Sequence, residues 1–554
     1  MYSHLNSSMN PRPPLENERF QVIVIGGGIN GVAIARECAR LGQRTLLVEQ
    51  HDFAAGTTSR STRMIHGGLR YLEHGDIAQV HESLRERQWL LRRYPHLVNP
   101  LQFFLALDRN SRRSALAVRA GLWLYRRLYR NKLQAGLAEE LIRNEQRQLE
   151  RLLDADRRFS VFNFEDAQCE FPERLVAEWL IEAVEAGAVA RNHTRVLAIE
   201  AQNGCATGVW LQDQYSGQEE HVQATWIINA TGPWVDRVCQ SSGISLQHPL
   251  MGGVRGSHIV LPRFAGAPDA AVYTEAVDGR PIFVVPWNDQ VLVGTTEVQD
   301  DGDPAQAGPS PNEIEYLLRS LLRLFPRVGV SQSDIHYALA GVRPLPFSPD
   351  KKASAISRRH YLHDHAPEGA ARMLSVIGGK LTTAASLARE CATKIGLHPQ
   401  VPSVAVGPEV ALDHLLERLV IETAEAGGIG QPSARAILEW HGSHSMMIAR
   451  LALNNPDLSA ALCPHTAHIA AEALYALKQE SAITLGDILL RRVPVALGPC
   501  WSPACTREAA ARIARAAGWD GRRTAVEVEA FEAEQAAFLR KPTNRNAAME
   551  PAVN

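Results

Sequence analysis

One short stretch combines arginines, histidines, acids and a pair of glycines: residues 61–76, STRMIHGGLRYLEHGD. It lacks the regular apolar spacing of a core helix or strand. Its composition suits two structures, a solvated surface loop or the wall of a pocket that binds an anion. The choice between them depends on the elements that surround the stretch in the chain.

A glycine-rich turn lies upstream, between an apolar run and an alanine-rich helical pattern. Gly26, Gly28 and Gly31 have G-x-G-x-x-G spacing and follow the buried-strand pattern of residues 22–25. Such glycines permit a tight turn, the approach of a pyrophosphate and close packing of helix on strand. Glu49 ends the next predicted strand, 21 residues after Gly28, and can accept hydrogen bonds from an adenosine ribose. Together these features predict a dinucleotide-binding site.

Two later strand-to-glycine junctions indicate FAD rather than NAD. They lie at residues 226–236, WIINATGPWVD, and 374–384, LSVIGGKLTTA. An NAD-binding unit is usually contiguous, whereas an FAD-binding domain assembled from several segments has this layout. We expect the positive end of the helix after Gly379 to face the flavin, where negative charge develops in the reduced ring.

The chain resembles the FAD-dependent respiratory glycerol-3-phosphate dehydrogenases, which belong to the D-amino-acid-oxidase-like flavoprotein superfamily. The matching stretches follow the family's order between residues 20 and 385: VIVIGGGINGVAIARECARLG, IHGGLRYLEH, NATGPWVD, RGSHIVLP, GTTE followed by GDP, ALAGVRPL and SVIGGKLTT. EALYALKQESAITLGDILLRR and AGWD look like that family's C-terminal helical domain. In one departure, Arg63-Met64 stands where many family members carry a lysine before IHGG, so the positive charge is kept.

The resemblance implies an α/β and α+β fold in three parts. They are a discontinuous Rossmann-like FAD-binding domain, a substrate domain with a mixed or antiparallel sheet, and an all-helical C-terminal domain. Strand-like runs between residues 257 and 345, with a helix near 311–325, agree with the second part. We expect the following boundaries: FAD-binding domain 20–256 and 372–400, substrate domain 257–371, helical domain 405–540, and disordered tails 1–19 and 541–554.

The resemblance also implies an activity, the oxidation of sn-glycerol 3-phosphate to dihydroxyacetone phosphate. The hydride would pass from C2 to N5 of non-covalently bound FAD, and the electrons would then pass to membrane quinone. The enzyme alternatives are a glycerol-3-phosphate oxidase that uses oxygen or another flavin oxidase of the superfamily. A catalytically silent flavoprotein is the alternative from another class. It is disfavoured because the expected substrate cations are all present.

The expected substrate is a dianion, so its pocket needs cations, preferably arginines that form bidentate contacts. By the family's motifs, Arg70 and Lys380 are assigned mainly to the phosphate. Arg343 is assigned to the substrate oxygens and to developing negative charge, and Arg255 is a weaker anion contact.

The C2 hydroxyl needs a proton acceptor, and the resemblance offers two histidines. His66 and His258 compete for this role, because an imidazole titrates near neutral pH, and the sequence does not separate them. In such flavoproteins residues 61–76 return beneath the isoalloxazine ring, which favours the pocket wall over the surface loop. The expected FAD contacts are Gly26, Gly28, Asn30, Gly31, Glu49, Ser61, Thr62, Gly67, Gly68, Val196, Gly232, Gly379, Lys380, Leu381 and Thr382.

Composition excludes several other classes of protein. Lysine and arginine total 58 against 60 acids, a balance that argues against a general nucleic-acid binder. The eight scattered cysteines favour a reducing cytoplasm over a disulfide framework, and Cys500 and Cys505 lack the spacing of a metal site. The N-terminus has no apolar core of a signal peptide, and no apolar run is long enough to span a bilayer.

Quinone lies in the bilayer, so a quinone-reducing enzyme must contact the membrane surface. We therefore expect a cytoplasmic protein, peripheral on the cytoplasmic face of the inner membrane, with a homodimer left open. Residues 112–130 are the sequence candidate for that contact, because they combine an apolar face with clustered arginines. A domain-surface helix with solvent-directed arginines is the equal alternative. The apolar face contains Val118, Leu122, Tyr125 and Tyr129, and the basic face contains Arg112, Arg119, Arg126 and Arg130.

Overall fold

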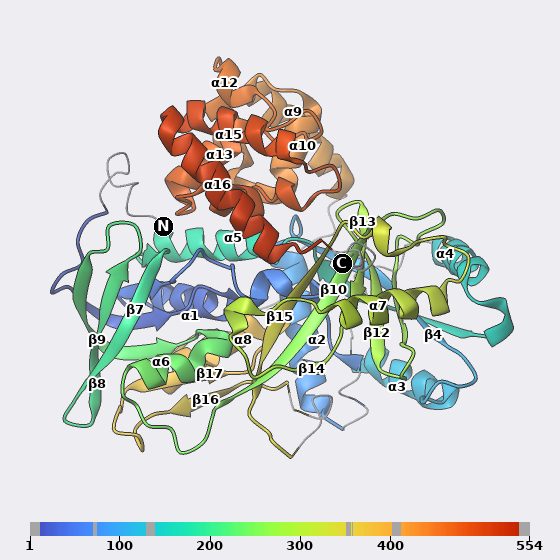
Figure 1. The fold of residues 1–554 in the computed structure, drawn as a ribbon, viewed down its shortest axis with the longest axis horizontal. Coiled ribbons are helices and arrows are strands. Elements are labelled where there is room, and N and C mark those ends of the chain that lie inside the picture. Colours follow the sequence, from blue (N-terminus) through green and yellow to red (C-terminus); the bar gives the residue numbers. More distant parts are fainter. Residues whose placement is uncertain are drawn as a thin grey trace, which may run out of the picture.

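The computed structural model describes residues 12–69, 72, 75–128, 139–350, 356, 358–401 and 412–541. Two large sheets form the lower part of the molecule, and a group of helices lies above them (Figure 1). Arg70, Tyr129 and Arg130, named above, lie outside the described residues, as do positions 1–11 and 542–554 of the expected tails.

The first sheet contains the glycine turn and has a parallel centre. Its strand order is β16-β17-β9-β1-β2-β6, and parallel pairing joins β17, β9, β1, β2 and β6 in turn. The antiparallel strands β7 and β8 extend it from β9. The strands are β1 Arg19–Ile25, β2 Thr45–Val48, β6 Val189–Arg191, β7 Thr194–Gln202, β8 Cys205–Asp213, β9 Glu219–Asn229, β16 Tyr361–Asp364 and β17 Met373–Ile377.

Three helices from distant parts of the chain share a core beside this sheet: α1 Ile29–Arg40, α5 Pro172–Glu185 and α8 Ala384–Lys394. The centre of the sheet thus joins the start of the chain to β9 and β17, as expected of a discontinuous domain. Part of the expected N-terminal tail belongs to the fold as well. Arg12 donates to the carbonyl of Asn192 at 2.7 Å, and Leu15 is buried against the sheet.

The second sheet is mostly antiparallel, in the order β14-β10-β13-β12-β11-β4-β5-β3 with β15 also paired to β10. Only the pair β11–β4 is parallel among its described strand pairs. The expected helix near 311–325 is α7, Pro311–Leu324, which begins with a capping box of Ser310 and Glu313. The strands are β3 Met64–Ile65, β4 Val98–Leu107, β5 Ser160–Cys169, β10 Met251–Pro262, β11 Ala271–Glu275, β12 Pro281–Trp287, β13 Gln290–Gly294, β14 Val298–Gln299 and β15 Tyr337–Pro346.

The two sheets do not follow the domain boundaries expected from sequence. Strands β3, β4 and β5 come from the range 20–256 yet lie in the second sheet, whereas β16 comes from 257–371 yet pairs with β17 in the first. Apolar packing explains the position of β4, because Phe103 and Leu105 are buried in one core with Tyr273 of β11. The second sheet therefore draws strands from two separate parts of the chain.

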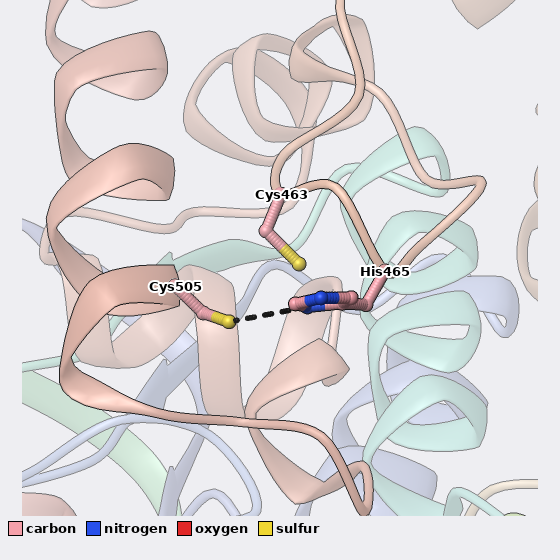
Figure 2. Close-up of side chains that lie close together, drawn as sticks. All are labelled: Cys463, His465 and Cys505. Carbon is pink, nitrogen blue, oxygen red and sulfur yellow. Dashed lines mark hydrogen bonds between the residues drawn. The ribbon is translucent and has the colours of Figure 1, made fainter.

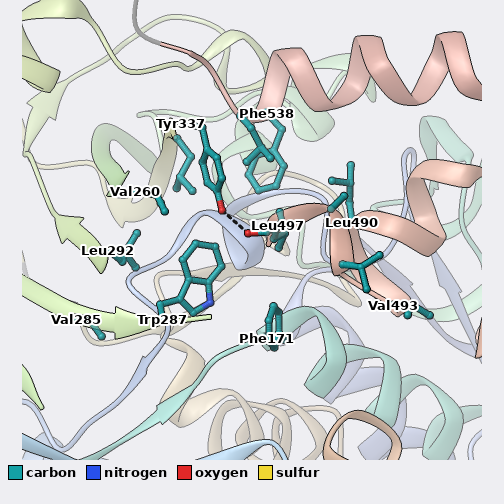
Figure 3. Packing of buried hydrophobic residues seen from close by; sticks show 14 of the residues in the cluster. Phe171, Val260, Val285, Trp287, Leu292, Tyr337, Leu490, Val493, Leu497 and Phe538 are labelled. Atoms are coloured by element: carbon teal, nitrogen blue, oxygen red, sulfur yellow. Dashed lines mark hydrogen bonds between the residues drawn. The ribbon is translucent and has the colours of Figure 1, made fainter. Parts of the chain in front are cut away.

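Residues 412–541 form the C-terminal part, and its described regular elements are helices, apart from isolated β-bridges. It packs on the second sheet through apolar side chains: Leu490, Leu497 and Phe538 meet Trp287 and Tyr337 (Figure 3). The Tyr337 hydroxyl donates to the Leu497 carbonyl at 2.8 Å. The helices are α9 Leu412–Gly427, α10 Gln431–His441, α11 Ser445–Ala452, α12 Pro456–Ser459, α13 Ala470–Gln479, α14 Leu485–Asp487 followed by a π-helical turn at Ile488–Arg492, α15 Pro503–Ala517 and α16 Gly521–Phe538.

Helix α3, Ala115–Leu128, carries the residues expected at a membrane, but its apolar face is turned inward. Val118, Leu122 and Tyr125 are buried in the protein core, so this face is not available to lipid. The outer face instead exposes Leu116 (77%) and Trp123 (66%). No helix within the described ranges combines the length and apolar character needed to cross a bilayer. The remaining helices are α2 Ile77–Arg93, α4 Glu139–Leu152 and α6 Val235–Ser241.

Candidate active site

The glycine turn joins β1 to α1 in a conformation that side chains would block. Gly26 has φ +106°, and a Cβ at Gly31 would lie 1.8 Å from the Gly26 carbonyl oxygen. Gly28 is the N-cap of α1 and provides no side-chain cap. Thr58 Oγ1 accepts from the Ile29 amide at 3.1 Å, and the following amides of the first helical turn have the direction that a pyrophosphate site requires.

Glu49 lies beside this turn at the end of β2. Its Oε2 accepts from the Gly27 amide at 2.7 Å, and its Oε1 accepts from the His51 amide at 2.9 Å. These bonds orient the carboxylate and leave further lone pairs for sugar hydroxyls. The Glu49 carbonyl accepts from the Thr194 amide at 2.8 Å, which brings the start of β7, and with it Val196, to the same end of the sheet.

The first and third glycine motifs meet in space. A Cβ at Gly379 would lie 2.5 Å from Asn30 Nδ2, and Gly379 has φ +99°. The buried Asn30 Oδ1 has no hydrogen-bond partner among the described atoms. An unsatisfied buried acceptor in the first turn of α1 fits a site completed by a polar cofactor. Gly232, with φ +61°, begins a short turn after β9, the parallel neighbour of β1.

A cavity adjoins these motifs and answers the question posed by residues 61–76. Its wall includes much of the described part of that stretch, together with side chains of the second sheet and residues 380–382. The stretch is therefore a pocket wall rather than a surface loop. The lining residues are Ser61, Thr62, Arg63, Met64, His66, Gly68, Leu69, Phe103, Phe164, Asp166, Tyr273, Pro281, Phe283, Thr295, Arg343, Arg358, Lys380, Leu381 and Thr382.

The described lining residues include four cations but a single carboxylate. Arg63 and Arg358 are bound by acids: Arg63 pairs with the buried Glu173 at 2.8 Å, and Arg358 pairs with Glu297 at 3.0 Å. The carboxylate, Asp166, is bound by Arg87 at 2.6 Å. Arg343 and Lys380 are the other two cations. The cavity is therefore suited to an anion.

Strand β15 holds Arg343 so that its guanidinium reaches this cavity. Its Nη2 donates to Thr295 Oγ1 at 3.0 Å and to the Thr296 carbonyl at 3.1 Å. On the paired strand β10, two residues beyond the direct partner of Arg343, a Cβ at Gly256 would lie 2.5 Å from Arg343 Nη2, so glycine provides the space for the guanidinium. Lys380 Nζ donates to Ser83 Oγ of α2 at 3.3 Å.

The structure separates the two candidate histidines. His66 lines the cavity, and its backbone amide donates to Thr382 Oγ1 at 3.1 Å. The buried His258 does not line the cavity, but Thr62 does. The Nε2 atom of His258 lies 2.9 Å from Oγ1 of Thr62. Burial, with help from the charges of Arg343 and Arg63, lowers the pKa of His258 to about 3. His258 is therefore neutral at physiological pH and reaches the cavity through Thr62.

Comparison with known proteins agrees with this geometry. A protein-family model described as "FAD dependent oxidoreductase" matches residues 21–385, and one described as "C-terminal domain of alpha-glycerophosphate oxidase" matches residues 372–524. A glycerol-3-phosphate dehydrogenase of Synechocystis sp. is 37% identical over 501 residues, which cover 88% of this chain and 90% of the relative. The chain belongs to the FAD-dependent glycerol-3-phosphate dehydrogenase family. It is an FAD-dependent oxidoreductase.

Another relative supports this assignment, and two solved structures share the fold. The glycerol-3-phosphate dehydrogenase of Pseudomonas aeruginosa is 34% identical and covers 89% of this chain and 95% of its own. The fold is like that of the glycerol-3-phosphate dehydrogenase from Bacillus halodurans complexed with FAD, with TM-score 0.74, 21% identity, and coverage of 96% of this chain and 97% of that one. The L-alpha-glycerophosphate oxidase from Mycoplasma pneumoniae with FAD bound has TM-score 0.52 and 17% identity, and the match covers 70% of this chain and 97% of that one.

Some residues expected in this flavoenzyme's site lie elsewhere or have another task. Arg255 is not among the lining residues, because Asp300 and Glu313 hold its guanidinium at 2.5 and 2.9 Å. Gly67 is among the expected FAD contacts. However, a Cβ at Gly67 would lie 2.3 Å from the Tyr125 hydroxyl, so the missing side chain makes room for Tyr125. Gly68 does line the cavity.

The sequence reasoning missed several residues of the cavity wall. A buried network lies behind Gly67, in which Asp166 accepts from the Tyr125 hydroxyl at 2.8 Å and from Arg87 at 2.6 Å. Arg358, Thr295 and Gly256 were missed as well. The obstacle was distance along the chain, because these residues come from helices, loops and strands that meet only in the folded protein. Of these residues, Thr295 and Gly256 lie inside the family motifs GTTE and RGSH, so the motifs could have indicated them.

We expect the Glu49→Arg variant to lose most of its FAD on purification, because a cation replaces the ribose acceptor at the glycine turn. FAD content is read from the ratio of flavin to protein absorbance, and wild-type protein should release free FAD on acid precipitation. Glu315→Arg, on the exposed side of α7, is the matched control and should retain FAD. Equal flavin content in both variants would show that Glu49 is not at the ribose.

Proposed function

We propose that the enzyme oxidises sn-glycerol 3-phosphate to dihydroxyacetone phosphate. The observation that carries the proposal is that Arg343 and Lys380 line the cavity, in addition to Arg63 and Arg358, whose charges are balanced by Glu173 and Glu297. The names of the relatives point to the same substrate. A phosphate dianion is stabilised by several cations at once, which a neutral or zwitterionic substrate does not need.

The chain's own residues have distinct proposed tasks. Arg343 and Lys380 bind the phosphate and the substrate oxygens, and Arg70 is a further proposed phosphate contact outside the described residues. Bound FAD supplies the hydride acceptor for the C2 hydrogen. The proton of the C2 hydroxyl goes to His66 directly or to His258 through Thr62, whose hydroxyl lies 2.9 Å from the ring of His258.

Anaerobic stopped flow tests the substrate directly. Mixing glycerol 3-phosphate with the oxidised holoenzyme should bleach the flavin absorbance within the turnover time, and plain glycerol at equal concentration should not. Glycine and D-alanine probe the amino-acid-oxidase alternative. Reduction by one of these instead, with no response to glycerol 3-phosphate, would overturn the proposed function.

The pH profile of flavin reduction should distinguish the two bases. If His258 accepts the proton, the rate at saturating substrate stays level as pH falls through the ordinary imidazole range, because the pKa of His258 is lowered to about 3. His258→Asn should then lower the rate more than His66→Asn does. A rate that falls with an ordinary imidazole pKa, and that His66→Asn abolishes, would assign the base to His66.

We propose quinone as the electron acceptor, with oxygen as the second candidate. The similarity of the C-terminal part to the domain described for alpha-glycerophosphate oxidase favours the oxygen alternative. The two acceptors differ in their product. A dehydrogenase reduces a soluble quinone analogue without stoichiometric hydrogen peroxide, whereas an oxidase forms one peroxide per substrate oxidised.

The exposed face of α3 is our candidate for the peripheral membrane contact of a quinone reductase. Leu116 and Trp123 are exposed there beside the exposed Arg119 and Arg127. Arg112 and Arg126 are less suitable than the sequence indicated, because they donate to Asp278 and Asn163. Arginines near an anionic lipid surface contribute about 1 kcal/mol each, and insertion of the apolar side chains would add to this.

We therefore expect the enzyme to sediment with anionic vesicles at low salt and to dissociate as ionic strength rises. The triple variant Trp123→Ala, Arg119→Gln, Arg127→Gln should sediment much less, with unchanged turnover of a soluble dye. Trp210→Ala is the matched control, because Trp210 is 43% exposed on β8. Equal binding of the triple variant and the control would exclude α3 from the contact.

A further inference from the structure

Sulfur and imidazole ligands meet in the helical domain, away from the residues that line the cavity. Cys463 and His465 lie in the loop before α13, and Cys505 lies in the first turn of α15. Their three side chains converge on one point (Figure 2). The ligand atoms all lie within 4.8 Å of one another, and Cys505 Sγ is 3.7 Å from His465 Nδ1.

These separations match the ligand spacing of a tetrahedral zinc site. Bonds of about 2.3 Å to sulfur and about 2.0 Å to nitrogen place neighbouring tetrahedral ligands about 3.5–3.8 Å apart. The distance of 3.7 Å between Cys505 and His465 falls within that range. The other two pairs of ligand atoms are at most 4.8 Å apart, so they would need to approach by no more than about 1 Å to bind one ion.

The backbone holds both ligand segments before any ion binds. The turn with Cys463 is closed at its base, where the Leu462 amide donates to the His468 carbonyl at 2.8 Å and the Ala470 amide donates to Ala460 at 3.0 Å. Ser502 caps α15 and accepts from the Cys505 amide at 3.3 Å. Ligands positioned in this way lose little conformational freedom on binding an ion.

The surroundings also suit a metal thiolate. Cys505 lies at the positive end of α15, which stabilises a negative sulfur. Both cysteine residues are almost wholly buried, with Cys463 1% and Cys505 3% exposed. His465 is exposed, so an ion can enter and bind from the solvent side. Cys500 is exposed, and its carbonyl oxygen lies 3.7 Å from Cys505 Sγ.

We propose that Cys463, His465 and Cys505 bind a zinc ion that joins the loop before α13 to the start of α15. The spacing of Cys500 and Cys505 alone did not predict such a site, because Cys463 is brought in by the fold. Zinc has no redox chemistry of its own, so its task here is to stabilise the helical domain. The site is independent of the substrate proposed above.

Metal analysis of the full-length holoenzyme, purified without a metal-affinity column, tests the site. We expect about one zinc per chain after equilibration with zinc and dialysis. Replacement by cobalt should produce a thiolate-to-cobalt charge-transfer band and the visible bands of a tetrahedral ion. A chelator should lower the thermal midpoint, because an ion that binds only the folded state stabilises it.

Single replacements identify the ligands. Each of three variants should weaken zinc binding by at least about 100-fold: Cys505→Ser, Cys463→Ser and His465→Ala. Removing a residue that only supports a metal ligand already costs up to about 100-fold, and removing the ligand itself should cost more. His465 is exposed, so its variant keeps the fold, with FAD content as the check. Cys205→Ser on β8 is the matched control and should bind zinc as the wild type does.

Two results would overturn the proposal. One is a wild-type protein that takes up neither zinc nor cobalt, or whose uptake is unchanged in all three ligand variants. The other is a disulfide between Cys463 and Cys505 in protein purified under reducing conditions, seen as a mass lower by one pair of hydrogens and two fewer titratable thiols. Both readouts are independent of turnover, so they remain valid if the proposed substrate is wrong.

Discussion

Arg343→Leu is expected to lower kcat/KM for glycerol 3-phosphate by about 30-fold to several-thousand-fold while FAD stays bound. Loss of a charged hydrogen bond in a desolvated site costs roughly 2–5 kcal/mol, which corresponds to that range. Arg343 reaches the cavity from β15, and Thr295 and the Thr296 carbonyl hold its guanidinium in place. Leucine keeps the volume of the side-chain stem but removes the charge. Steady-state kinetics with a dye acceptor measures the loss.

Companion variants separate a local effect from a general loss of charge. Lys380→Met removes the second proposed phosphate cation and should lower kcat/KM within a similar range. Arg237→Leu is the matched control, because Arg237 is half exposed and pairs with Asp303 on the surface. It should behave as the wild type does. If Arg343→Leu kept the wild-type kcat/KM for glycerol 3-phosphate, the assignment of Arg343 would be wrong.

The second large effect is on stability: Glu480→Gln is expected to lower the free energy of unfolding by about 3–5 kcal/mol. Glu480 forms a two-pronged ion pair with Arg174 of α5, at 2.9 and 3.0 Å, and both side chains are fully buried. Glutamine has nearly the same shape but leaves the guanidinium without its counter-charge. Arg174 also donates to the Trp440 and Arg492 carbonyls, so it cannot move out to water without breaking further bonds. Urea unfolding, followed by tryptophan fluorescence, measures the change.

The pH dependence of this difference provides a further check. Burial opposes ionisation of Glu480, but Arg174 and His441 outweigh it and hold the pKa of its carboxyl well below the usual 4.5. A carboxyl whose pKa is lowered by folding stabilises the protein at pH values above its unfolded-state pKa. This stabilisation is lost as pH falls from that pKa towards the lower pKa of the folded state. The gap between wild type and variant should therefore be complete near neutrality and shrink below about pH 4.5.

An exposed pair provides the matched control for the buried one. Glu422 pairs with Arg418 four residues earlier on α9, and these side chains are 41% and 76% exposed. Glu422→Gln should cost less than about 0.5 kcal/mol, because solvent screens the pair and both side chains lose freedom in forming it. Equal losses in the two variants would show that burial does not amplify the Arg174–Glu480 interaction.

The sequence alone determined the cofactor and the general fold. Gly26, Gly28 and Gly31 act within a single turn, and Glu49 ends the neighbouring strand, so their spacing in the chain already defines their spacing in space. The strand β1, the helix α1 and the helix α7 are local elements too, set by residues a few positions apart. Family membership followed from such local motifs taken in order.

The tertiary structure decided which side chains share the cavity and which do not. Arg255 and Arg343 are both arginines in motifs, but Asp300 and Glu313 bind the first, while strand pairing turns the second toward the cavity. The direction of the apolar face of α3 was equally undetermined, because an amphipathic pattern shows that one face is covered without showing what covers it.

The cysteine cluster has the same physical origin. Cys463 and Cys505 lie on segments that approach only when α13 and α15 pack together. Ion pairs, cavity walls and metal ligands of this kind depend on contacts between residues far apart in the chain, and those contacts exist only after the sheets and helices have packed.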